Sequence, residues 1–149
     1  MRITDRKRQN MNDPKPPNAS SPLVDIRAFD NKSNLKLINS YGENSFRISG
    51  ELHIGSIILA PRLTLAWCPP ENAHDLTVDH ILPHLGKTPP PLFILGVGGT
   101  PTAPMNDLAR SLKGLGIALE LMSTAAACRT WNVLMSEGRD AAAGVYSIA

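Results

Sequence analysis

From residue 92 onward, short continuous runs of apolar residues alternate with segments in which apolar residues recur at helical spacing. Residues 92–97 and 117–122 are short apolar runs bounded by turn residues, which is the pattern of buried strands, and a third strand is predicted over 142–148. Between these runs the apolar residues return every three or four positions, which is the spacing of one helix face. The pattern predicts strand, helix, strand, helix, strand.

Both predicted helices have recognisable ends. The first begins at Met105 and ends at the glycines at positions 114 and 116. The second is capped by Ser123 or Thr124 and ends at Gly138. Their apolar positions are Leu108, Ala109, Leu112 and Leu115 in the first helix, and Ala127, Cys128, Trp131, Leu134 and Met135 in the second. Strands that alternate with helices predict right-handed crossovers and a parallel sheet.

Upstream of this region, apolar residues recur at every second position, which is the spacing of a half-buried strand. Apolar and polar residues alternate through 46–54 and 63–67, with a turn at Gly50, and the continuous apolar run 57–59 predicts a buried strand. An edge strand before them is indicated by Leu35, Leu37 and Tyr41. We expect an antiparallel meander of three or four strands, followed by a short helix over 76–85 that Pro83 shortens or distorts.

Length and composition favour one α/β domain over residues 23–149. No apolar run approaches the roughly 20 residues needed to span a bilayer. Residues 1–22 lack hydrophobic periodicity and contain four prolines, so we expect a disordered tail. That tail holds five Lys or Arg against two Asp (net +3), whereas residues 23–149 hold ten against eleven acidic residues (net −1). A near-neutral domain argues against nucleic-acid binding.

The start of the chain is polar and basic and lacks the apolar core of a signal peptide, so we expect a cytoplasmic protein. The two cysteines, Cys68 and Cys128, lie in different motifs and form neither a zinc nor a redox pattern. No disulfide is expected in a reducing compartment.

Several motifs recur in the order seen in one known family. They are the stretch 46–61 with Trp67 after it, Gly98, the stretch 116–120, and 124–127 followed by Asn132, Leu134, Glu137, Gly138 and Arg139. Over roughly residues 38–149 the chain resembles the proteins grouped as domain of unknown function 498. The resemblance implies an Mth938-like fold, an antiparallel meander packed beside a small βαβαβ unit. The family includes complex I assembly factor 3 and adipogenesis-associated proteins, and it implies no catalytic residues.

Ligands of open parallel sheets bind beyond the carboxyl ends of the strands. The predicted loop after residue 97 and the start of the last helix both lie at that edge, where a helix offers free N–H groups and Arg129 offers a fork of donors. The candidate ligand or partner edge comprises Gly98, Gly99, Thr100, Thr124, Cys128, Arg129 and Asn132. We favour a tight turn and a capped helix that packs through its alanines, with Arg129 in solvent.

Sharper chemistry at these positions has counterarguments. A dinucleotide fingerprint is excluded because Pro101 occupies the place of its third glycine. A first-turn position tends to lower a thiol pKa, yet a buried apolar residue is the favoured interpretation of Cys128. Asn132 is best explained as a structural anchor. His80 and His84 have the spacing of a metal pair, but surface histidines are favoured.

No nucleophile–base set or acid–base pair stands out, and we predict neither a cofactor nor a metal. The favoured function is a non-catalytic interaction protein with a protein partner, without a nucleic-acid or membrane-spanning role; homo-oligomerisation stays open. The alternative is a small-molecule or anion-binding protein or enzyme that uses the loop 98–100 and the helix start. The predicted partner face is the edge of residues 98–104 and 123–129, and the second choice is the meander between Phe46 and Trp67.

Overall fold

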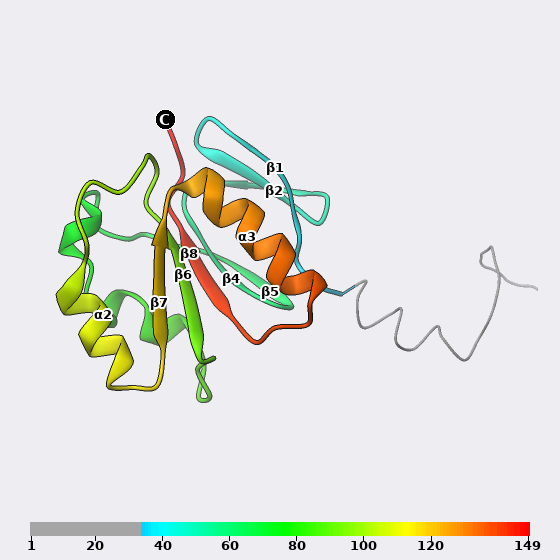
Figure 1. Cartoon of the computed structure of the whole chain (residues 1–149). Helices are drawn as coiled ribbons and strands as arrows, with labels where there is room; N and C mark the ends of the chain where they lie inside the picture. Colours follow the sequence, from blue (N-terminus) through cyan, green and yellow to red (C-terminus); the bar gives the residue numbers. More distant parts are fainter. Residues whose placement is uncertain (1–33) are drawn as a thin grey trace, which may run out of the picture. The chain divides into compact units, whose positions relative to one another are not determined.

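The computed structural model describes residues 34–149, of which Leu35–Ala149 form one compact unit (Figure 1). The predicted tail over 1–22 and the predicted domain boundary at residue 23 lie outside the described residues. Within the unit the α/β class is confirmed. Two sheets are present, one antiparallel with strand order β1-β2-β3 and one mixed with order β5-β4-β8-β6-β7.

The parallel unit follows the hydrophobic pattern closely. β6 (Leu92–Gly96) pairs in parallel with β7 (Ala118–Met122) on one side and with β8 (Ala142–Val145) on the other. Helix α2 (Asn106–Lys113) joins β6 to β7, and α3 (Thr124–Ser136) joins β7 to β8. The third strand ends at Val145, earlier than the predicted residue 148.

The meander differs from the prediction because it is divided between the two sheets. β1 (Ile38–Gly42), β2 (Ser45–Ile48) and β3 (Glu51–Ile54) form the small sheet alone. β4 (Ile57–Ala60) instead pairs with β8, and β5 (Leu63–Ala66) extends the large sheet beyond β4. The apolar run in β4 explains this, since three consecutive buried side chains need cover on both faces of a sheet.

The predicted helix over 76–85 is wrong. The region forms three short 3₁₀ turns, Ala73–Asp75, Val78–His80 and Leu82–His84. The His80 Nδ1 accepts a hydrogen bond from the Thr77 backbone N–H at 3.0 Å, which stabilises a local turn in place of a helix. Pro83 lies in the third turn, where its missing N–H and its ring oppose α-helical continuation.

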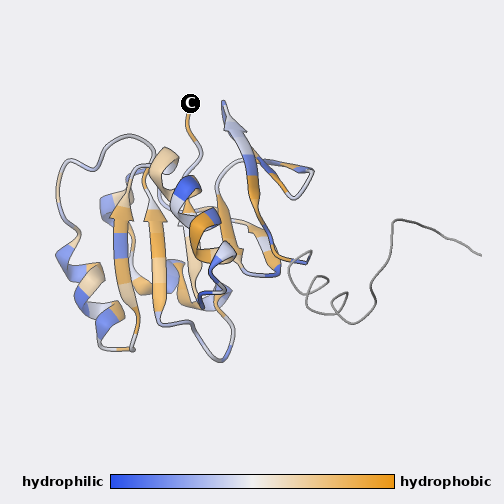
Figure 2. Cartoon of the chain, turned by 45° about the vertical axis from the view of Figure 1, so that its right-hand side comes forward, coloured by the Kyte–Doolittle hydropathy of each residue, from blue (hydrophilic) through white to orange (hydrophobic). Residues whose placement is uncertain are grey.

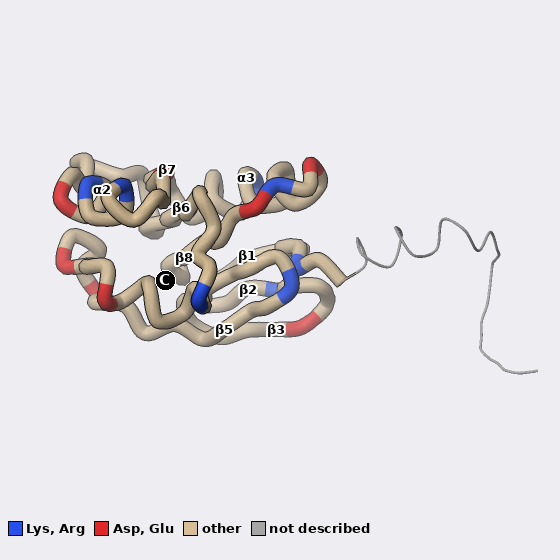
Figure 3. Tube along the Cα trace, turned by 90° about the horizontal axis from the view of Figure 1, so that it is seen from below, with Lys and Arg blue, Asp and Glu red and all other residues tan. Residues whose placement is uncertain are grey.

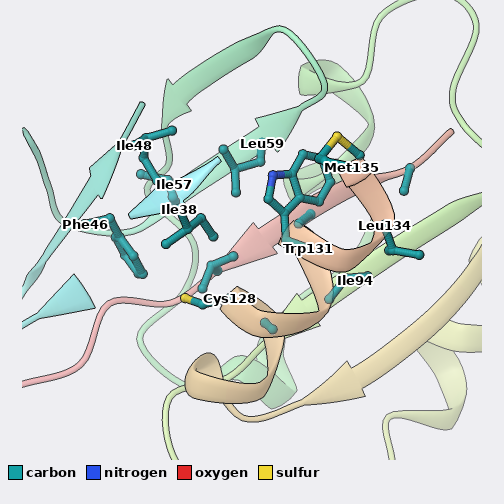
Figure 4. Packing of buried hydrophobic residues seen from close by; sticks show 14 residues of the cluster. Ile38, Phe46, Ile48, Ile57, Leu59, Ile94, Cys128, Trp131, Leu134 and Met135 are labelled. Carbon is teal, nitrogen blue, oxygen red and sulfur yellow. The ribbon is translucent and has the colours of Figure 1, made fainter. Parts of the chain in front are cut away.

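The large sheet is covered on both faces. One face packs against α3 and the small sheet in what we call the α3 cluster, in which Trp131 and Phe46 are fully buried (Figure 4). The other face packs against α2 and the 3₁₀ turns in the α2 cluster, which includes Phe93, Leu95 and Leu112. Figure 2 shows the apolar residues concentrated along the strands of the large sheet. Consecutive residues of β6 therefore serve opposite clusters, which is why its apolar run is continuous.

In the part of the chain that the structure describes, no helix is long and apolar enough to cross a membrane.

Candidate functional site

Gly98 and Thr124, two residues of the predicted edge, are bonded to each other. The Gly98 N–H donates to the Thr124 hydroxyl at 2.9 Å, and the Thr124 N–H donates to the Gly98 carbonyl at 2.8 Å. The Thr124 hydroxyl donates its own proton to the Tyr146 carbonyl at 2.6 Å. Thr124 is completely buried, so its side chain fastens the ends of β6 and β8 to the start of α3.

The start of α3 is capped without help from Thr124. The Ser123 hydroxyl accepts a hydrogen bond from the Ala126 N–H at 3.1 Å, so Ser123 is the N-cap of the two candidates. The helix also lies very close to β6, because a Cβ added to Gly96 would lie 2.8 Å from the Ala127 Cβ. Small residues here let helix and strand pack together.

Gly99 and Thr100 line an open groove of about 260 Å³. The groove is lined by residues of the loop 97–103 and of the segment 71–74, which brings Glu71 and His74 to it. Met105 and Leu121 also line it. The groove therefore lies on the α2 side of the strand ends, and of the predicted residues it involves only Gly99 and Thr100.

Cys128 is removed from this groove. Its side chain lies within the α3 cluster, and the residue is 4% exposed (Figure 4). Burial raises the pKa of the Cys128 thiol from its ordinary value of 9.0 to about 11, outweighing the opposite effect of the nearby Arg129 charge. The first-turn position therefore does not produce the lowered thiol pKa, because desolvation disfavours the thiolate more strongly.

Asn132 anchors the small sheet to α3. Its side-chain oxygen accepts the Ile38 N–H at 2.8 Å, and its amide donates to the Ile38 carbonyl at 2.8 Å. The neighbouring Trp131 Nε1 donates to the Lys36 carbonyl at 2.7 Å. Arg129, from the same helix, is exposed to solvent.

The histidine pair on the 3₁₀ turns is not arranged for a metal. His80 Nδ1 is occupied by the Thr77 backbone, and no cluster of three or more His, Cys, Asp or Glu within 34–149 could hold an ion.

Sequence reasoning missed that the segment 71–74 lines the groove, and it missed the role of Tyr146. The Tyr146 hydroxyl donates to the Pro70 carbonyl at 2.7 Å, and its ring meets Trp67 edge to face at 5.5 Å. Burial, together with the negative charge of Asp75, raises the pKa of Tyr146 to about 12. The hydrogen bond joins residues 76 positions apart in the chain, so no local pattern in the sequence predicts it.

Comparison with known proteins identifies the family of this chain. Residues 38–146 match the family described as "Protein of unknown function (DUF498/DUF598)". An uncharacterised protein of Rhodobacter capsulatus is 34% identical over 102 residues, which cover 68% of this chain and 77% of that protein. NADH dehydrogenase [ubiquinone] 1 alpha subcomplex assembly factor 3 of Danio rerio is 32% identical, over 73% of this chain and 63% of that protein. The human protein of the same name is 29% identical, over 68% and 55%. The chain thus spans somewhat over half the length of these assembly factors.

Solved structures share the fold. The crystal structure of a Bordetella parapertussis protein matches with a TM-score of 0.67 and 26% identity, covering 76% of this chain and 96% of that one. A solution structure from Bordetella pertussis, described as an Mth938-like domain, matches with a TM-score of 0.61 at 20% identity and covers 86% and 90%. The chain therefore belongs to the DUF498/DUF598 family and has the Mth938-like fold.

Proposed function

We propose that this chain is a non-catalytic protein-interaction protein with an assembly-factor-like role. By similarity to the assembly factors, we propose that it acts in the assembly of a respiratory complex. The observation that carries the proposal is the match to proteins named NADH dehydrogenase assembly factor 3 over most of the described domain. A cytoplasmic location remains a prediction.

The use of the polar side chains supports a binding role. The side chains of Thr124 and Asn132 form hydrogen bonds with the backbone of neighbouring segments, and the Cys128 thiol is buried and protonated at neutral pH. Side chains that are buried or already hydrogen-bonded to the backbone are poorly placed to act as a nucleophile or a base.

The proposed partner face is the edge of residues 98–104 and 123–129. The groove beside Thr100 offers a recess for a partner's side chain, and Arg129 is exposed and suited to meet an acidic group. The loop 98–104 is rich in glycine and proline, so its shape is set by the backbone.

Affinity capture from the native host, with the partner identified by mass spectrometry, tests this face. We expect Arg129→Glu to reduce capture at least about tenfold through like-charge repulsion, and Thr100→Arg to do the same by filling the groove. Lys113→Glu is the matched control, since Lys113 is an exposed cation on α2 outside this edge. Each variant should keep the melting temperature of the wild type.

Capture that survives both substitutions would refute this face and move the interface to the region between Phe46 and Trp67. Absence of any specific protein partner would count against the interaction function itself.

The groove also supports a second candidate, a small-molecule or anion site at the loop 98–100. Titration with phosphate and with acetate, followed by the amide NMR signals of Gly99 and Thr100, tests it. Saturating shifts that Thr100→Glu removes by repelling the anion would favour this candidate over the interaction face alone.

A further inference from the structure

β3 is an edge strand of the small sheet with an open hydrogen-bonding side. Its turn from β2 has two residues, Ser49 and Gly50, with φ of 48° and 88°, which is the type I′ hairpin. In such a hairpin the pairs alternate between bonded and non-bonded, and the Gly55 N–H donating to the Asn44 carbonyl at 2.9 Å fixes the phase. The N–H and C=O groups of Leu52 and Ile54 therefore point away from β2.

The same two residues carry exposed apolar side chains. Leu52 is 56% exposed and Ile54 is 66% exposed, the two highest values among large hydrophobic residues of the described part. They lie on one face of the strand, because they are two positions apart. β3 has no lysine or proline to discourage pairing, whereas the amide of Asn132 closes the outer edge of β1 at Ile38.

We propose that the occupant of this edge is a second copy of the chain, whose β3 pairs antiparallel with the first about a two-fold axis. In the pairing that fits, Leu52 of each copy lies opposite Ile54 of the other, and the two His53 residues face each other at the axis. This register uses the outward groups of both residues in both copies. A shift by two residues would bring the β2–β3 turn or Gly55 into the pairing and lose half of those bonds. The two small sheets become one continuous six-stranded sheet.

The polar side chains around β3 suit a symmetric partner. His53 Nε2 and Glu51 Oε1 lie 3.8 Å apart on one face, and in this register each Glu51 is also diagonal to the other copy's His53, so each carboxylate has an imidazole from either copy beside it. Arg47 is directly opposite Leu52 on β2, one strand back from the seam. The Cα atoms of the two copies of Arg47 would therefore lie about 16 Å apart, three strand spacings across and two residues along, which is beyond the range of strong repulsion at physiological salt.

The buried area sets the strength of the association. Covering the exposed parts of Leu52 and Ile54 in both copies removes on the order of 500 Å² from water, below the roughly 1,200 Å² of standard stable interfaces. The dimer is therefore reversible and depends on protein concentration. This inference does not rest on the proposed assembly role, because it needs no other protein.

Sedimentation velocity of the full chain over a wide concentration range tests the association. We expect the wild type to shift from monomer toward dimer as concentration rises, and Leu52→Lys and Ile54→Lys to remain monomeric. Val133→Lys is the matched control and should dimerise as the wild type does, since Val133 is 53% exposed on α3. A wild type that is monomeric throughout overturns the proposal, as does a dimer that survives both lysine substitutions.

A disulfide tests the register. In a Cys68→Ser background, which removes the exposed native thiol, His53→Cys should form a disulfide-linked dimer on mild oxidation, because facing non-bonded residues have Cα atoms about 4.5 Å apart. Glu51→Cys lies on the same face of the same strand but four positions out of register with its copy, so it should stay uncrosslinked. Equal crosslinking of both variants would overturn the register. Loss of captured partner in Leu52→Lys, with no dimer in the wild type, would assign the edge to a partner's strand instead of a second copy.

Discussion

Cys128 shows how burial decides the chemistry of a single residue. The position near the start of α3 favours a reactive thiolate, and the sequence alone leaves both a reactive and a buried cysteine open. The side chain lies in the α3 cluster, where it is withdrawn from water, so its pKa rises to about 11. A group that is neutral at pH 7 and packed among apolar side chains acts as a core residue.

Thiol labelling distinguishes this role from a catalytic one. We expect an alkylating reagent at neutral pH to modify the exposed Cys68 rapidly and Cys128 only slowly in the folded protein. Mass spectrometry of time points measures both rates within one sample, so Cys68 is the internal control. Comparable rates at the two sites would contradict a buried structural cysteine.

The raised pKa also predicts alkaline destabilisation. The unfolded chain releases the Cys128 proton near pH 9, whereas the folded chain holds it to about 11, so this contribution is fully present below pH 9 and is lost as pH rises through 11. The melting temperature of Cys128→Ala should therefore fall less steeply than that of the wild type between those values. Tyr146, whose pKa is also raised, keeps its alkaline effect in both proteins. Parallel curves would mean that Cys128 titrates alike in the folded and unfolded states.

At the scale of elements, α3 connects all the layers on its side of the large sheet. Its Ala127 lies against Gly96 of β6, its Trp131 is buried in the α3 cluster, and its Asn132 holds β1. An asparagine in mid-helix lowers helix stability, so its two bonds to one strand residue supply the compensation. The helix thereby fixes the small sheet on which β3 is the open edge.

Substitution of Asn132 should weaken the attachment of the small sheet to α3 and lower the free energy of unfolding. Asn132→Leu leaves both polar groups of Ile38 without partners, and we expect a loss of about 2–3 kcal/mol in the free energy of unfolding. Asn132→Asp should also be destabilising, because a carboxylate cannot donate to the Ile38 carbonyl. Urea unfolding measures both, with Val133→Ala as the control for an exposed change on the same helix. Stability within about 0.5 kcal/mol of the wild type for both would contradict an anchoring role.

At the scale of the whole molecule, the basic character belongs to one end. The net charge of +2 combines +3 over residues 1–22 with −1 over residues 23–149. Residues 23–149 thus lack the cationic excess of nucleic-acid-binding proteins. In the described part, Lys and Arg are interspersed with Asp and Glu (Figure 3). Its interactions are expected to depend on the shape and edges of the domain.

Deletion of residues 1–22 should leave the melting temperature nearly unchanged. Four prolines and few apolar residues cannot bury enough surface to offset the entropy of ordering. Calorimetry of the full chain and of the shortened chain measures the difference. A decrease of more than a few degrees would show that the segment contributes to the folded domain.

The sequence by itself determined the secondary structure wherever a hydrophobic period was long and its ends were marked. The runs that became β6 and β7, the capped start of α3 and the glycine after it carry local signals, because strand alternation, helix periodicity and capping depend on near neighbours. The helix expected over 76–85 failed because turn hydrogen bonds and Pro83 outweighed a weak period. Only the tertiary structure decided that β4 joins β8, that Thr124 connects the strand ends to α3, and that Ile38 is the partner of the Asn132 anchor. It also decided that segment 71–74 lines the groove and that β3 keeps an open edge. Each of these depends on contacts between residues far apart in the chain, whose partners the local pattern does not specify.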